Sequence, residues 1–212
     1  MAEKSFWSYK KDKEWFMNFL FYYGKYLIVL IVIAAIIVTC CISCAKRVVY
    51  DFEMFYLSDK HFDSRVFDNV ENALVDVVDD VDGKNGTVVS FNDYTAVPED
   101  AVVSDIDMVM TSKIHVEVAE GHGYLYIMNE DWVKFCVDGE LLEDISKYTG
   151  DESPCYYTEI TDNKFLNDLG VKNNGRLFAG IRVINYDRMS DDAEIKRHDN
   201  AFKALEFILK NK

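Results

Sequence analysis

The sequence predicts an N-terminal transmembrane helix followed by an α/β domain with a mixed sheet in a three-layer, sandwich-like arrangement. Residues 27–45 contain no charge, proline or glycine, which is the composition of a membrane-spanning helix. Beyond them, segments with the two-residue period of strands take turns with segments at helical spacing, a pattern typical of α/β domains. The whole chain has only two prolines and no Ser/Gly-rich run, so residues 46–212 are expected to form one domain.

The predicted transmembrane helix has the sequence LIVLIVIAAIIVTCCISCA. Eleven of its nineteen residues are Leu, Ile or Val, and a helix of this length is about 28 Å long, close to the thickness of a bilayer's hydrocarbon core. Lysines and aromatic residues are frequent in residues 1–26, which we expect to be cytoplasmic or interfacial. The apolar run is longer than that of a signal peptide, and no small-x-small cleavage site follows it cleanly, so an uncleaved anchor is the favoured interpretation. Acylation of Cys40, Cys41 or Cys44 is left open.

Charge favours one orientation of the anchor. The cations on its two sides are nearly balanced, so the positive-inside rule does not decide. Residues 1–26 carry five lysines against Glu3, Asp12 and Glu14, a net +2; because the whole chain carries −14, residues 46–212 carry −16. An acidic domain is repelled by anionic lipid and by nucleic acid. We therefore expect a single-pass protein of the cell membrane with a cytoplasmic N-terminus, an extracytoplasmic domain and no nucleic-acid partner.

One face of the predicted anchor carries small residues at a spacing of four: Ala35, Thr39 and Ser43. Such faces let two helices approach closely and sometimes dimerise, so a homodimer or a protein partner is one interpretation. The other interpretation, which is favoured, is that these small residues only face lipid and have no partner.

The periodicity along the domain predicts its elements. Strands are expected over 48–57, 87–91, 124–128, 155–160 and 177–185. Helices are expected from residue 63 or 64 to the glycines at 83 and 86, and over 101–120, 130–137, 141–148, 163–169 and 192–210. The segment 101–120 is ambiguous, because Ile114, Val116 and Val118 also alternate like a strand; its length and the glycines that follow favour a helix.

No motif in the chain predicts catalysis or a cofactor, and we expect no catalytic residue and no metal ion. The segment Asp80–Gly86 is similar to a calcium-binding loop, but Lys84 stands where a ligand is needed, so a turn between a helix and a strand is favoured. The four histidines do not have the spacing of a zinc site. Cys136 and Cys155 could form a disulfide or remain two free thiols, and the sequence does not decide between them.

The stretch AEGHGYLYIMNEDWVKFCVDGELLEDISKY, residues 119–148, resembles one segment of extracellular solute-binding proteins: a helix, a glycine turn, a strand, a short helix and a G-x-L-x-D-I-S sequence. The leader with YYGKY, the single span and the strand YDFEMFYLSD resemble small membrane-anchored proteins of Gram-positive bacteria. Together these resemblances imply an extracytoplasmic domain like one lobe of a solute-binding protein. No ligand-contacting residue of that family maps onto this chain.

The binding site is therefore expected where an open α/β sheet forms its crevice, at the carboxyl ends of the strands. The candidate ligand-binding residues are Ser58, Asp59, Asn92, Asp93, Asn129, Asp131 and Trp132. The alternative is that they are only good turn-forming residues. The favoured function is a non-catalytic binding domain for an unknown ligand. An accessory subunit that docks a partner protein of the cell envelope or a transporter is the second hypothesis, and an enzyme is the third.

The predicted orientation can be tested with protease on intact cells. Because the domain is expected outside, added protease should digest residues 46–212 and leave the N-terminal segment protected. Immunoblotting with tags at both ends measures this, and permeabilised cells are the control. An acidic domain that survives on intact cells and is digested after permeabilisation would reverse the orientation.

Overall fold

The computed structural model describes residues 13–45, 48–83, 86–95, 105–121, 123–171 and 175–211. Its contacts divide the chain into two compact units, Met1–Val48 and Val49–Lys212. The first unit contains one long apolar helix, and the second is an α/β domain.

The first unit is built on helix α1, Lys13–Ala45. Its segment Phe19–Ile42 has 24 residues and a mean hydropathy of 2.8, which makes it long and apolar enough to cross a membrane. Its large apolar side chains are exposed, as expected for a helix that contacts lipid instead of a protein core. The Thr39 hydroxyl donates to the Ala35 carbonyl at 2.8 Å, so within the helix its polar group is already satisfied. The side chain of Ser43 lies outside the described part of the chain.

The domain contains a five-stranded mixed sheet with the order β2-β1-β3-β5-β4. The central strand β1 (Phe52–Ser58) is parallel to both of its neighbours, β2 (Val89–Thr95) and β3 (Leu125–Met128). Strand β5 (Phe178–Ile181) is antiparallel to β3, and the two-residue strand β4 (Thr158–Glu159) pairs with it at the edge.

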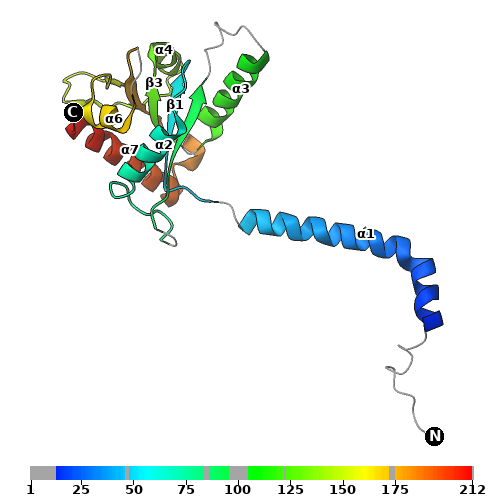
Figure 1. Cartoon of the computed structure of the whole chain (residues 1–212). Helices are drawn as coiled ribbons and strands as arrows, with labels where there is room; N and C mark the ends of the chain where they lie inside the picture. The colour runs from blue at the N-terminus through cyan, green and yellow to red at the C-terminus, as the bar shows by residue number, and fades with distance from the viewer. Residues whose placement is uncertain are drawn as a thin grey trace. The chain divides into compact units, whose positions relative to one another are not determined.

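Two crossover helices connect the parallel strands on opposite faces of the sheet (Figure 1). Helix α2 (Ser64–Leu74) leads from β1 to β2, and α3 (Asp105–Glu120) leads from β2 back across the sheet to β3. The two connections run in opposite directions, so they can have the same hand only if their helices cover opposite faces. This constraint produces the three-layer arrangement.

Strand β1 contributes alternate side chains to both cores. Phe52, Met54 and Tyr56 point into the core under α2, α6 (Lys164–Leu169) and α7 (Asp192–Lys210). Phe55 and Leu57 point into the core under α3 and α4 (Glu130–Asp138). A strand buried on both faces reads as a nearly continuous apolar run, which is the appearance of FEMFYLS.

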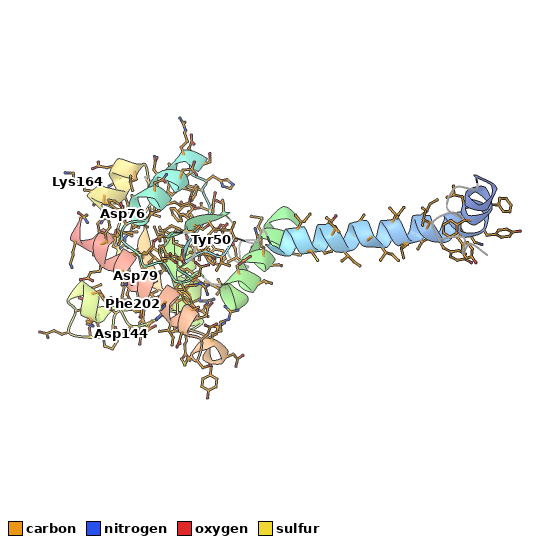
Figure 2. All side chains as sticks on the ribbon, turned by 90° about the horizontal axis from the view of Figure 1, so that it is seen from below. Tyr50, Asp76, Asp79, Asp144, Lys164 and Phe202 are labelled. Carbon is orange, nitrogen blue, oxygen red and sulfur yellow. The ribbon has the colours of Figure 1, made fainter. Side chains whose placement is uncertain are left out.

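Buried polar side chains fasten the loop before β2 to the rest of the domain. The carboxylate of Asp51 is 2% exposed and accepts from the N–H groups of Val81 (2.8 Å) and Val88 (2.7 Å). Asn200 of α7 bonds to both backbone groups of Asp79, which lies beside that helix in Figure 2. These contacts satisfy the backbone of a segment that has no regular structure of its own.

The predicted fold class is confirmed, and so is the helix in the ambiguous segment, where Ile114 and Val118 are buried one turn apart. Several boundaries were wrong: β1 begins at Phe52 instead of residue 48, and β4 contains only two of the expected residues 155–160. Helix α2 ends at Leu74, because the residues after it bond to Asn200 and Asp51. Leu142 forms an isolated antiparallel bridge with Arg182, and the helical turn α5 begins only at Ser146 and ends at Thr149. Strand β5 is shorter than expected, and β2 extends to Thr95.

The two cysteines of the domain are free and lie in different cores. Cys136 on α4 is fully buried in the core under α3 and α4. Cys155 packs against the core on the opposite face, and its thiol donates to the Tyr157 carbonyl at 3.0 Å. The structure therefore has two free thiols here.

Arg182 clamps the C-terminal end of α3 to the sheet. It is 1% exposed and donates from Nη1 to the Val118 carbonyl and from Nη2 to the Gly121 carbonyl (2.8 Å). Its guanidinium also lies over the Tyr124 ring, 4.9 Å from the centroid. A cation at this end complements the helix dipole and satisfies carbonyls that have no partner within the helix.

Replacing Arg182 with Met should therefore destabilise the domain. A buried carbonyl left without a donor costs about 1–3 kcal/mol, and the packing against Tyr124 is also changed, so we expect a loss of about 3 kcal/mol. Near-ultraviolet circular dichroism of the full chain should show a Tm about 6–12 °C lower. The matched control is Arg188→Met, which removes a second, part-buried donor to Gly121 at 3.1 Å and should cost less than about 1 kcal/mol. Equal losses would contradict the clamp.

Candidate functional site

The carboxyl ends of β1 and β3 form a topological switch point. The chain leaves β1 toward β2 through α2 on one face, and it leaves β3 in the other direction through α4 on the opposite face. Open α/β sheets form their ligand crevices at such points, because the two connections diverge and leave the strand ends uncovered. The polar side chains at this edge are therefore the candidate site.

One group of side chains joins the ends of β1 and β3. The Asn129 N–H donates to the Leu57 carbonyl at 3.1 Å, which holds the two strand ends together. Its side-chain Nδ2 donates to Asp59 at 3.2 Å, while its Oδ1 accepts from the Trp132 N–H at 3.1 Å and caps α4. The Ser58 hydroxyl donates to the same Asp59 oxygen at 3.3 Å. The structure thus brings together Ser58, Asp59 and Asn129.

A second group lies at the neighbouring ends of β1 and β2. The Asp93 carboxylate contacts His61 Nδ1 at 2.7 Å through Oδ2 and accepts from the Thr95 hydroxyl at 2.6 Å through Oδ1. Thr95 Oγ1 is also 2.9 Å from His61 Nδ1. The Thr95 hydroxyl proton is donated to Asp93, so the proton between Thr95 Oγ1 and His61 Nδ1 must come from Nδ1. Nε2 is therefore the ring nitrogen that is free of these contacts, and the His61 side chain is 70% exposed.

Tyr56 links the two groups. It precedes Ser58 on the same face of β1, and its register partner on β2 is Asp93. Burial raises the pKa of the Tyr56 phenol to about 12; a hydrogen bond with Ser58 lowers it, and the negative charges of Asp93 and Asp59 raise it further. Both carboxylates therefore raise the pKa of one phenol, and the two groups lie at adjoining strand ends.

Three of the residues predicted from sequence do not join this site. Asn92 lies within β2, because the strand continues to Thr95, and strand alternation places it on the α3 face, opposite to Asp93. Asp131 lies on the exposed side of the first turn of α4. Trp132 is fully buried in the core, with its ring 5.3 Å from that of Phe135, so no ligand reaches it.

Tyr56, His61 and Thr95 were missed by sequence reasoning. Tyr56 lies within the first predicted strand, whose alternation gives no sign of a polar role for it. Thr95 joins the site only through the parallel register that pairs it with Ser58, which a single sequence does not reveal. His61 could have been proposed from the sequence, because Lys60 and His61 closely follow the end of an apolar strand.

A second cluster of carboxylates has a structural explanation. Asp51, Asp80 and Asp82 each offer an oxygen within 4.8 Å of the others. Both oxygens of Asp51 accept backbone N–H groups, and Asp80 accepts from the Gly83 N–H at 2.6 Å. These bonds give Asp51 and Asp80 a structural role in holding the backbone at 81, 83 and 88.

A third polar cluster lies at the opposite, amino-terminal edge of the parallel strands. The buried Glu194 accepts from the Tyr124 hydroxyl at 2.6 Å and from Arg197 at 2.5 Å, so both of its oxygens have partners. Nearby, burial raises the pKa of Glu53; the negative charges of Glu117 on α3 and Glu194 on α7 raise it too, whereas Arg197 lowers it. Because both oxygens of Glu194 already accept hydrogen bonds within the protein, this cluster is a weaker candidate for a ligand site.

Glu53 should make stability depend on pH. The pKa of Glu53 in the folded state is raised above the usual value of 4.5. The contribution of Glu53 to folding stability is therefore fully present below pH 4.5 and is lost as the pH rises through the folded-state pKa. Glu53→Gln removes the carboxylate and should raise Tm by a few degrees at pH 7 while leaving it unchanged at pH 4. Thermal unfolding at both pH values measures this, with the exposed Glu152→Gln as the control. A decrease at pH 7 would contradict the assignment.

Comparison of the chain with protein-family models, with curated proteins and with solved structures finds no match. The functional conclusion therefore depends on the residues and geometry of this chain.

Proposed function

We propose that this chain is a membrane-anchored extracytoplasmic domain that binds a small polar ligand at the β1–β3 switch point and does not catalyse a reaction. The observation that carries the proposal is the convergence of Ser58, Asp59 and Asn129 with the His61–Asp93–Thr95 group around one buried phenol. These side chains come from the ends of three different strands, which is how a crevice site of an open sheet is built.

The chemistry of the site favours a ligand rich in hydrogen-bond donors, such as an amine or a polyhydroxyl compound. Asp59 and Asp93 supply acceptor oxygens, and the exposed ring of His61 adds Nε2. Phosphate fits less well. The N-termini of α2 and α4 are already capped by Asp63 and Asn129, so they do not present bare N–H groups to an anion.

The anchor and the charge of the domain support the location. Helix α1 is apolar and long enough to hold the protein in a bilayer, and the −16 charge of residues 46–212 disfavours close contact with anionic cytoplasmic lipid. A single ligand-binding lobe is also what the resemblance to solute-binding proteins implies. One lobe binds its ligand in an open crevice and does not close around it like a two-lobed trap.

An accessory subunit that docks a protein of the cell envelope or a transporter is the second candidate function. It is favoured by the outer side of α3, where Met108, Val109 and Val116 are 60%, 66% and 57% exposed. Val109 and Val116 lie two turns apart on one face of the helix, so together they form an apolar strip. A protein partner would bind there and leave the switch point unoccupied.

The proposal predicts that the chain retains a small molecule when it is purified gently. The full chain should be extracted with its surrounding lipid into polymer-bounded discs and examined by native mass spectrometry for small molecules and proteins. Asp59→Asn and Asp93→Asn each remove one charged acceptor, so each should reduce the bound small molecule at least about tenfold.

Asp131→Asn is the matched control, since it removes the same charge from an exposed position beside the site and should leave the bound molecule unchanged. Retention of the small molecule in all three variants would contradict the site. Capture of a protein that is lost in Val109→Ser or Val116→Ser, with no small molecule, would favour the accessory subunit instead.

A further inference from the structure

A cavity of about 300 Å³ lies at the C-terminal end of α4, lined by Val137, Glu140, Leu142 and Tyr156. Leu142 is almost fully buried, while Val137 and Tyr156 are 38% and 44% exposed, so the cavity opens to solvent. Its volume is at the lower end of the range for small-molecule sites. Helix α4 has nine residues and is about 13 Å long, with Asn129 of the switch point before its first residue and this cavity beyond its last.

The backbone at Glu140 is unusual. Its φ of +54° is the one positive value among the described non-glycine residues. Glu140 closes α4: its N–H donates to the Val137 carbonyl at 3.0 Å, and the Leu141 N–H donates to the Cys136 carbonyl at 2.9 Å. This is the helix ending in which glycine normally occupies the left-handed position. In this chain the glycine is one residue earlier, at 139. Glu140 occupies the left-handed position, where glycine would have a lower conformational energy.

A side chain in the left-handed region costs about 1 kcal/mol relative to glycine. Residues held in such conformations are frequent at ligand sites, where the side chain is needed in spite of the strain. Glu140 lines the cavity together with two aliphatic residues, Val137 and Leu142, and the aromatic residue Tyr156. This combination offers a charge, an apolar wall and a π face to one ligand.

We propose that this cavity is a second binding site, specific for a small organic cation with an apolar body. The carboxylate of Glu140 pairs with the cation, Tyr156 contributes a cation–π contact, and Val137 and Leu142 cover the apolar part. The −16 charge of residues 46–212 favours cations at the surface in general. The site is independent of the switch point, and its failure would leave the proposed function untouched.

Benzylammonium and its uncharged analogue benzyl alcohol test the proposal directly. The full chain in lipid nanodiscs, labelled with ¹³C in its Val and Leu methyl groups, is titrated with each probe, and the Val137 and Leu142 methyl signals are followed. We expect saturable shifts with benzylammonium and an affinity for benzyl alcohol at least about tenfold lower, the difference made by one charged contact.

Two variants of Glu140 separate binding from folding. Glu140→Gln keeps the shape and should bring the two probes to equal affinity. Glu140→Gly should raise Tm, because it relieves the left-handed backbone, and should also lose the preference for the cation. Asp138→Asn is the matched control: it removes an exposed carboxylate two residues away and should keep the preference. Equal affinities in the unmodified chain, no saturable shift, or a preference that survives in Glu140→Gln would each overturn the proposal.

Discussion

The architecture of the domain depends on the burial of β1 between two parallel neighbours. A central strand with apolar side chains on both faces must be covered on both faces, and Phe52–Ser58 is apolar at nearly every position. Parallel pairing with β2 and β3 requires crossover connections, and these two run in opposite directions. They place α2 and α3 on opposite faces, which buries both sides of β1 up to its last residue, Ser58. The candidate site lies at this carboxyl end, where the chain becomes exposed from Asp59 onward.

Polar interactions hold the edges of this apolar centre. At one end, Asn129 joins the ends of β1 and β3 and caps α4 in the same contact. At the other, Arg182 joins the end of α3 to β5, and Asp51 and Asn200 hold the loop before β2. Each of these side chains satisfies backbone groups that would otherwise lie unpaired near the core. The site is therefore rigidly supported at Asn129, and its exposed members, Asp59 and His61, are those left to contact a ligand.

The elements predicted from the sequence are those whose patterns are set by local burial. The apolar alternation of the first strand and the spacing of Ile114 and Val118 both report a covered face, so these elements were found. The end of α2 was not found, because it depends on bonds to Asn200, which is more than a hundred residues away in the chain. The same limit applies to the site. Ser58, Asp59 and Asn129 follow their strands directly and could be proposed, whereas Thr95 enters the site only through its pairing with Ser58. Trp132 looked accessible because it follows a strand, but the first turn of α4 directs it into the core.

The central claim is that ligands of this protein bind at the ends of β1 and β3. Hydrogen–deuterium exchange of the full chain in lipid nanodiscs tests it most directly, measured with and without the low-molecular-mass extract of the cells that produce the protein. The account predicts slower exchange in peptides that contain residues 58–63 and 128–132, with exchange across 105–120 unchanged. Protection confined to 105–120, or no protection at the strand ends at any extract concentration, would contradict it.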